Sequence, residues 1–178
     1  MAEYAIVTPI EFKCLLGAVP KLKHRMALDT LCHTGLRYNE YRLLAEHPEW
    51  FSAKNREIVL PAKATKTKRD RNIPLTPAFS QKLELWLSSN KLSAPSMQGM
   101  DKNLQRWCEV AGIKRISVKT FRKTWLTYLL MSMPEKADLI YASMGHSREI
   151  SARHYLIMTG TLKNEIEAVK EAVRGWNT

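Results

Sequence analysis

The sequence predicts a mixed α+β fold that is mostly helical, with a small three-stranded antiparallel sheet. Apolar residues recur at helical spacing over most of the chain, and short β-type runs interrupt this pattern near residues 50–75. The chain has 178 residues, of which 45% are apolar, and only seven glycines and eight prolines. This composition argues against a disordered or fibrous chain and is sufficient for one compact domain, which we expect to span residues 1–178.

Three helices are expected before the β-type runs. Residues 8–11 read Thr-Pro-Ile-Glu, which combines an N-cap residue, a proline at the first helical position and a glutamate at the third, so a helix should cover 9–18. Pro20 separates it from a second helix over about 21–33, which Gly35 should end. A short third helix is expected over 38–45.

The middle of the chain then changes character. Trp50-Phe51, Glu57–Leu60 and Asn72–Leu75 are short β-type runs, and we expect them to pair as an antiparallel sheet. From Pro77 onward the pattern is helical again, with glycines and prolines as punctuation. The expected helices are about 77–89, 99–111, 119–131, 134–144, 148–157 and 161–175.

The charge of the chain is strongly basic and unevenly distributed. The formal net charge is +11, yet the first 50 residues carry six basic and six acidic side chains. Most of the excess falls in two runs, which are Lys63, Lys66, Lys68, Arg69 and Arg71, and Lys114, Arg115, Lys119, Arg122 and Lys123. Concentrated cations in a folded domain favour a phosphate-rich partner, because binding releases counterions. A solvated surface with a flexible loop is the alternative for the first run.

Cysteine and hydropathy patterns exclude several classes. Cys14, Cys32 and Cys108 are far apart, without the spacing of a zinc ribbon or a disulfide scaffold, and their apolar neighbours predict core thiols in a reducing compartment. No window is long and apolar enough for a membrane span, and the first residues lack a secretory signal. No set of side chains has metal-ligand spacing, so we expect neither a metal nor another cofactor.

Five separated blocks carry isolated functional side chains in a specific order. They are Thr34–Leu44 with Arg37, then Lys66 eight residues before Pro74, Lys119–Thr127 with Arg122, Met144–Ser147 with His146, and Ala152–Leu156 with Tyr155. In order and spacing this pattern resembles the catalytic domain of the tyrosine recombinases, the phage-integrase family, over about residues 8–160. The resemblance implies that family's helical catalytic domain and its DNA strand exchange.

The resemblance assigns the covalent chemistry to Tyr155. In the family this tyrosine attacks a DNA phosphate, forms a 3′-phosphotyrosyl bond and frees a 5′-hydroxyl, without ATP or metal. A phenol has a pKa near 10, so it needs cationic neighbours to act as a nucleophile. Arg37 and Arg122 are expected to hold the non-bridging phosphate oxygens, because guanidinium is a permanently charged fork that matches phosphate.

The remaining matched positions support this step. Lys66 corresponds to the family's hairpin lysine, a general acid for the leaving 5′-oxygen, and its distance from Pro74 favours it over Lys63 and Lys68. His146 corresponds to a histidine that donates to the phosphate; the alternative is a helix-end histidine bonded to the last carbonyls.

Lys119 stands where the family usually has histidine, as in some archaeal virus and plasmid integrases. We expect it to contact phosphate. Lysine at its ordinary pKa is a poor general base, so the base stays open: either the cations around Lys119 favour its neutral form, or water or another group takes the proton.

The resemblance also implies partners. Double-stranded DNA carrying a recombination site is the expected substrate, held in the cytoplasm by a homo-oligomer that is a tetramer on DNA and a monomer or weak oligomer without it. Residues 161–175 have apolar positions at helical spacing and are either a helix packed on its own domain or one exchanged between protomers. Because the first helix begins near residue 8, we expect the family's N-terminal DNA-binding domain to be absent. The expected DNA contacts are Lys63, Lys68, Arg69, Arg71, Lys114, Arg115 and Lys123.

Two other functions compete with this interpretation. A type IB topoisomerase uses a similar site for strand relaxation, although the blocks around Arg37 and His146 are closer to integrases. A non-catalytic DNA-binding relative would need no intact site, and the six occupied positions argue against it. The DNA sequence recognised, and cleavage in cis or in trans, stay open.

Overall fold

The computed structural model describes residues 6–89 and 94–145. Its first part is helical, with α1 (Pro9–Ala18), α2 (Leu22–Thr34) and α3 (Tyr38–Glu46), close to the predicted ranges. The Thr8 hydroxyl accepts from the Glu11 N–H at 3.3 Å, and the Glu11 carboxylate accepts from the Thr8 N–H at 2.8 Å. This reciprocal cap satisfies N–H groups that a helix start otherwise leaves unpaired.

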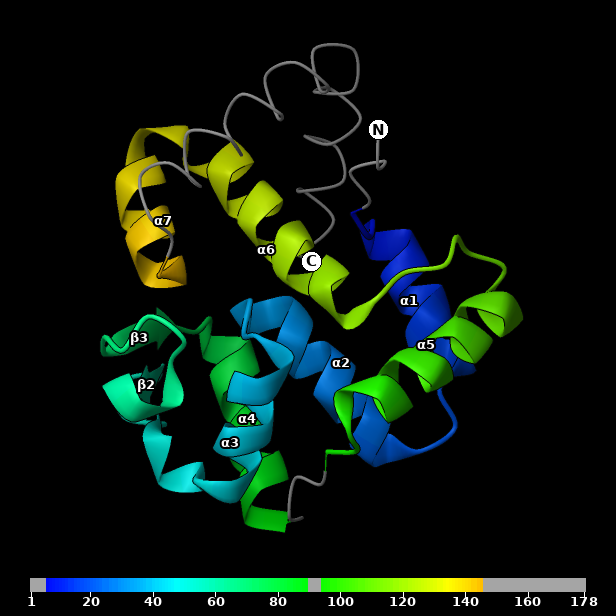
Figure 1. The fold of residues 1–178 in the computed structure, drawn as a ribbon, viewed down its shortest axis with the longest axis horizontal. Helices are drawn as coiled ribbons and strands as arrows, with labels where there is room; N and C mark the ends of the chain where they lie inside the picture. Colours follow the sequence, from blue (N-terminus) through cyan, green and yellow to red (C-terminus); the bar gives the residue numbers. More distant parts are fainter. Residues whose placement is uncertain (1–5, 90–93, 146–178) are drawn as a thin grey trace.

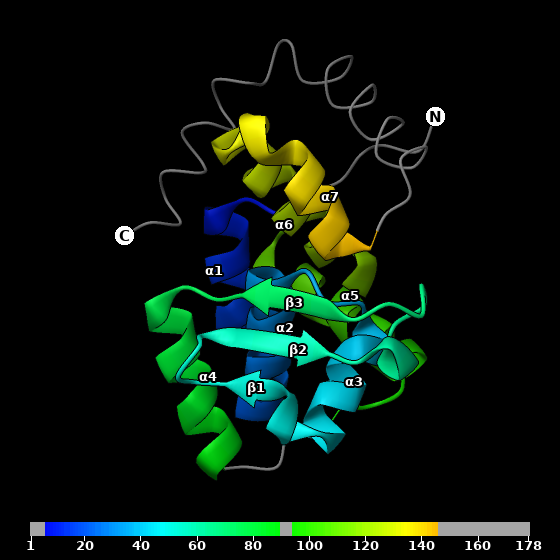
Figure 2. The same cartoon turned by 90° about the vertical axis from the view of Figure 1, so that its left-hand side faces the viewer.

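The predicted sheet is present with three antiparallel strands in the order β1-β2-β3 (Figure 2). They are β1 (Phe51–Ser52), β2 (Glu57–Leu60) and β3 (Arg71–Pro74). Ile58 lies opposite Ile73, and Leu60 lies opposite Arg71. Alternate side chains of a strand share one face, and on this sheet the face with Ile58, Leu60 and Ile73 is fully buried.

Within the described residues, four further helices follow, namely α4 (Pro77–Ser89), α5 (Met97–Ala111), α6 (Val118–Ser132) and α7 (Ala137–Met144). The segment predicted as one helix over 134–144 instead begins with a 3₁₀ turn, Pro134–Lys136. The predicted helices 148–157 and 161–175 lie outside the described residues. The mostly helical fold with one small antiparallel sheet is therefore confirmed for the described part of the chain.

Two clusters of apolar side chains hold these elements together. The larger one joins α1, α2, α3, the sheet, α4, α5 and the start of α6, with Tyr41 and Phe121 among its largest fully buried members. The second joins α6 to α7 through Leu126, Leu130 and Met144. In Figure 1, α7 accordingly lies beside the far end of α6, and its C-terminal end points down toward β3. The end of α7, β3 and the start of α3 thus come close together.

One prediction from composition is wrong. Cys32 and Cys108 are buried as expected, but Cys14 is exposed on the outer side of α1. Helix α1 turns Phe12 and Leu15 toward the core, and the two positions between them along the chain, one of which is Cys14, face solvent. Within the described residues, no helix is long and apolar enough to span a membrane.

Candidate active site

A pocket of about 700 Å³ opens where the first turns of α3 and α6, the connection between β2 and β3, and the end of α7 meet. Four of the six predicted catalytic residues line it, namely Arg37, Lys66, Lys119 and Arg122. These residues come from three segments that are remote in sequence, and the fold brings them to one pocket. His146 and Tyr155 lie outside the described residues. Met144, the last residue of α7, lines the same pocket.

Arg122 is held between two helix ends. Its Nη1 donates to the Gly35 carbonyl at 2.6 Å, and its Nη2 donates to the Met144 carbonyl. Only 12% of its side chain is exposed. Both acceptors are main-chain carbonyls, so the guanidinium is fixed by the backbone of α2 and α7 and does not depend on a mobile side-chain partner.

The end of α2, at Gly35, can be occupied only by glycine without strain, for two reasons. Its φ is +60°, in the left-handed region that disfavours a Cβ atom. A Cβ there would also lie 2.4 Å from Cε3 of Trp125, whose ring covers the residue. The Trp125 indole N–H in turn donates to the His33 carbonyl at 3.1 Å. Trp125 therefore fixes the α2–α3 turn against α6 beside the bond that holds Arg122.

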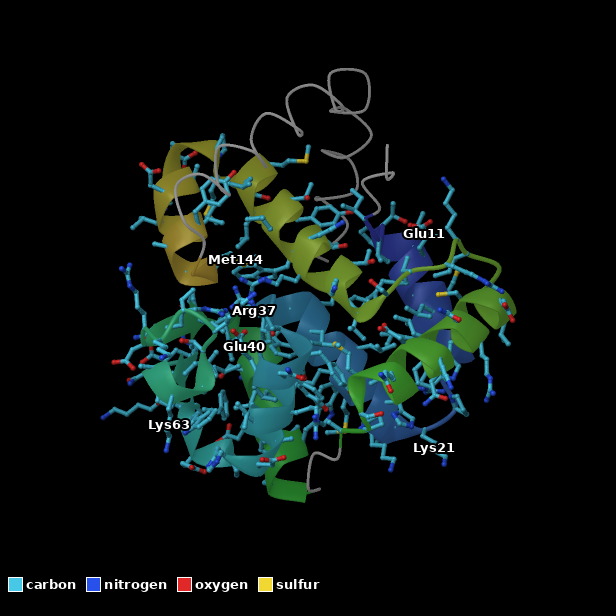
Figure 3. All side chains as sticks on the ribbon, in the orientation of Figure 1. Glu11, Lys21, Arg37, Glu40, Lys63 and Met144 are labelled. Atoms are coloured by element: carbon cyan, nitrogen blue, oxygen red, sulfur yellow. The ribbon has the colours of Figure 1, made fainter. Side chains whose placement is uncertain are left out.

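Glu40 is a buried carboxylate at the back of the site, only 2% exposed. It accepts from the Arg37 backbone N–H at 2.8 Å and from Arg37 Nη1 at 2.7 Å. Arg71 Nη1 lies 2.9 Å from each of its two oxygens, and Arg122 Nη1 lies 3.9 Å from one of them. One carboxylate thus lies among three guanidinium groups. Figure 3 shows Glu40 beside Arg37 below the end of α7, where Met144 is labelled.

The pKa values of Glu40 and Arg122 both lie below their usual values, for different reasons. Burial alone would raise the pKa of Glu40, but Arg71 and Arg37 outweigh burial and hold that pKa below its usual value. For Arg122, burial and then the positive charges of Arg37 and Arg71 lower the pKa to about 9. The fold therefore holds cationic charge at Arg122 against a desolvation cost, and a bound anion would relieve that cost.

Lys66 projects from a connection that orders itself by internal hydrogen bonds. The buried Thr65 hydroxyl donates to the Arg69 carbonyl at 2.8 Å and accepts from the Arg69 N–H at 3.1 Å. The Asp70 carboxylate accepts from the Ala62 N–H at 2.7 Å. These bonds close the loop on either side of Lys66, which is exposed and faces the pocket.

Lys119 lies in the first turn of α6, one turn before Arg122, so both side chains are on the pocket side of the helix. The Asp101 carboxylate accepts from the N–H of Val118 at 2.9 Å and so ties this first turn to α5. The prediction that Lys119 and Arg122 lie on one face of a helix is confirmed, because both belong to α6 and both line the pocket.

Six of the seven residues expected to contact DNA are accessible, and one is not. Lys63, Lys68, Arg69, Lys114 and Arg115 are exposed, Arg115 pairs with Glu109 at 2.5 Å, and Lys123 lines the pocket itself. Arg71 does not lie at the surface. It is only 4% exposed, because it shares the buried face of β3 with Ile73. Its expected role as a surface DNA contact is therefore wrong.

Glu40 and Trp125 contact the cations of the pocket or their supports, but the sequence reasoning did not assign them to the site, and it gave Gly35 only the role of a helix stop. For Glu40 a signal was present, since it follows Arg37 by three residues, the spacing of a helix-capping carboxylate. Within residues 6–89 and 94–145, no group of His, Cys, Asp and Glu side chains could hold a metal ion.

The site and fold agree with a family assignment. The model of the phage integrase family matches residues 6–159. The chain therefore belongs to the phage integrase family. No curated protein sequence matches it significantly.

Solved structures show the same fold. The XerH site-specific recombinase bound to its difH substrate, in a pre-cleavage complex, is similar with a TM-score of 0.64 and 19% identity, covering 90% of this chain and 52% of that one. The XerH post-cleavage complex with a palindromic difH substrate gives a TM-score of 0.66 and 20% identity, covering 98% and 54%. The chain thus spans about half the length of these structural relatives. The likeness confirms the expected tyrosine-recombinase catalytic fold.

Proposed function

We propose that the chain is the catalytic part of a site-specific DNA recombinase or integrase that cuts and rejoins DNA through a 3′-phosphotyrosyl intermediate. The observation that carries this proposal is the single pocket lined by Arg37, Arg122, Lys66 and Lys119. Two partly buried guanidinium groups and two lysines suit a phosphodiester that becomes more negative in its transition state. Membership of the phage integrase family supports the same reaction.

In the proposed cleavage step, Tyr155 gives its phenol proton to neutral Lys119, to water or to another group, its oxygen attacks the phosphorus, and the bond to the 5′-oxygen breaks. Lys66 gives a proton to that leaving oxygen, which becomes a 5′-hydroxyl. Arg37 and Arg122 hold the non-bridging oxygens, assisted by Lys119 and His146. In the rejoining step a 5′-hydroxyl from another strand attacks the phosphotyrosine and releases the tyrosine. The phosphate bond energy is kept throughout, so neither ATP nor a cofactor is required.

Accessible cations outside the four candidate catalytic ones extend the proposal to DNA binding. Lys63, Lys68 and Arg69 on the hairpin, together with Lys114, Arg115 and Lys123, would neutralise backbone phosphates on either side of the reacting one. Binding of this kind is weak for a single domain and falls steeply with salt. We further propose that the active form on DNA is a homotetramer in which residues 161–175 are exchanged between protomers.

The element of origin follows from one position. Lys119 replaces the histidine usual in the family, a variant that is similar to integrases of archaeal viruses and plasmids. We therefore propose that the chain integrates the DNA of such a mobile element in the cytoplasm of its host cell.

Covalent capture tests the proposed reaction. The full chain is incubated, in EDTA, with a library of nicked duplexes of randomised sequence, and products that survive SDS and boiling are recovered. We expect a protein–DNA adduct, and we expect Arg37→Ala and Arg122→Ala each to slow its formation by about 10²-fold or more. No adduct from any sequence would contradict the proposal. On a supercoiled plasmid that carries two copies of the captured sequence, relaxation without exchange between the two sites would instead favour a topoisomerase.

A chemical rescue separates Lys66 from its neighbours. Lys66→Ala should slow cleavage of ordinary DNA but not of a duplex with sulfur at the leaving position, because a thiolate leaves without a proton. Lys63→Ala and Lys68→Ala serve as matched controls and should bind less tightly but cleave at an unchanged rate when protein is saturating. If sulfur fails to restore Lys66→Ala, Lys66 is not the acid.

A further inference from the structure

Arg71 is the least exposed of the three arginines around Glu40. Its side chain is 3% exposed, against 12% for Arg122 and 28% for Arg37. It belongs to β3, its Nη1 lies 2.9 Å from both Glu40 oxygens, and its Cδ lies 3.5 Å from where a Cβ on Gly145 would be. Arg71 therefore reaches from the sheet to α3 and the end of α7.

The arrangement sorts the three arginines by the surface that they face. Arg37 and Arg122 line the pocket, whereas Arg71 is buried and is not among the residues that line it. Glu40 carries one negative charge, so the charge that it shares with Arg71 is not available to the other two guanidinium groups. Arg122 Nη1 lies 3.9 Å from Glu40, beyond hydrogen-bond distance, and donates to the Gly35 carbonyl instead.

We propose that Arg71 is a positioning residue that neutralises the buried Glu40 and so leaves the charges of Arg37 and Arg122 to the substrate phosphate. This inference rests on the proposed function for the identity of that phosphate. Without Arg71, the carboxylate would attract Arg122 and Arg37 more strongly, and the net charge facing the pocket would fall by one unit. A tenfold change in rate needs only a small change in activation free energy, compared with the interaction energy of two charges in a buried site.

The fold should survive the loss of this arginine. Glu40 keeps its bonds from the Arg37 backbone and side chain, so no carboxylate is left buried without a partner. Two nitrogens of Arg71, Nε and Nη2, have no hydrogen-bond partner among the described residues, so an apolar side chain of similar length gives up little there. Arg71→Met is therefore a usable probe.

The test compares single-turnover cleavage of the captured duplex by four variants of the full chain. Arg71→Met should cleave about 10- to 100-fold more slowly than wild type, with DNA affinity within about threefold, because Arg71 does not face DNA. Adding Glu40→Gln removes the carboxylate charge and should recover at least half of that loss on a logarithmic scale. Arg71→Lys keeps the positive charge and should stay within about fivefold of wild type. Lys54→Met, at the exposed turn between β1 and β2, is the matched control and should be unchanged.

A merely structural role for Arg71 makes the opposite prediction, since a second change in the core would not restore the rate. The proposal is overturned if Arg71→Met cleaves like wild type, if the double variant is no faster than the single one, or if Arg71→Lys is as slow as Arg71→Met. Circular dichroism confirms folding, and Arg71→Gln with and without Glu40→Gln replaces the pair if Arg71→Met does not fold.

Failure of the proposed function gives a different result. A wild-type chain that forms no adduct would refute that function and, with it, the catalytic part of this inference. The pairing itself is then read from thermal unfolding. Glu40→Gln leaves Arg71 as a buried cation without its partner, so adding Arg71→Met should raise the melting temperature of that variant.

Discussion

Replacement of Gly35 by alanine should damage both the stability of the fold and the position of Arg122. The left-handed backbone at φ +60° costs an alanine about 1–2 kcal/mol. The new Cβ would lie 2.4 and 2.7 Å from two carbons of Trp125, and such overpacking costs about 1–3 kcal/mol. The unfolding free energy should therefore fall by about 2–5 kcal/mol, which lowers the melting temperature by about 10 °C in a chain of this size.

Two other glycines separate the contributions. Gly112 also has a positive φ, +67°, but nothing lies within 4 Å of its Cβ position, so Gly112→Ala reports the backbone strain alone. Gly17 lies in α1 with open space around it, so Gly17→Ala should be neutral or stabilise by about 0.5–1 kcal/mol. Thermal unfolding followed by circular dichroism measures all three.

The order of the three melting temperatures shows whether the contact with Trp125 adds to the backbone strain at Gly35. We expect Gly17→Ala to be the most stable, Gly112→Ala intermediate and Gly35→Ala the least stable. Because the Gly35 carbonyl accepts from Arg122, only Gly35→Ala should also slow cleavage, by more than about tenfold. If Gly35→Ala melts with Gly112→Ala, the contact with Trp125 does not constrain the turn and the reasoning fails.

Three further predictions concern pH, salt and assembly. Burial alone would raise the pKa of Asp29, but hydrogen bonds from His33 and Lys82 hold it below its usual value, so its stabilising contribution is present above about pH 4 and is lost as the pH falls through the lower folded-state pKa. Asp29→Asn should therefore flatten the acid side of the stability profile measured by urea unfolding. Lys68→Ala should reduce the slope of log binding constant against log salt by about one, as measured by fluorescence anisotropy. Removal of residues 161–178 should abolish concentration-dependent association in sedimentation, and unchanged association would contradict helix exchange.

Much of the fold could be predicted because its signals are local. The cap at Thr8 and Glu11, the glycine stop at Gly35 and the β-type run that contains Ile73 act within a few residues of chain. The assignment of Arg37, Lys66, Lys119 and Arg122 to one candidate site rests on their family-like order and spacing. Their convergence on a single pocket is a property of the fold, which the spacing of Lys66 and Arg122 does not itself contain.

The predictions for Arg71 and Cys14 are wrong because a run of similar residues does not show which way each side chain points. The basic run that ends at Arg71 predicts a surface residue. However, Arg71 lies two residues before Ile73 and four before Leu75, so it shares their buried face. Cys14 was assigned to the core from its apolar neighbours, although it faces outward on α1. The role of Glu40 required tertiary information, because its two strongest partners come from β3 and from its own helix.

The central claim is that a phenol oxygen becomes covalently attached to DNA phosphate under the control of this cationic pocket. Mass spectrometry of the captured adduct after protease and nuclease digestion tests it most directly. We predict a nucleotide attached through phosphate to the peptide that contains Tyr155, and no adduct from Tyr155→Phe. A nucleotide mapped to any other side chain, or an adduct that persists in Tyr155→Phe, would contradict the account.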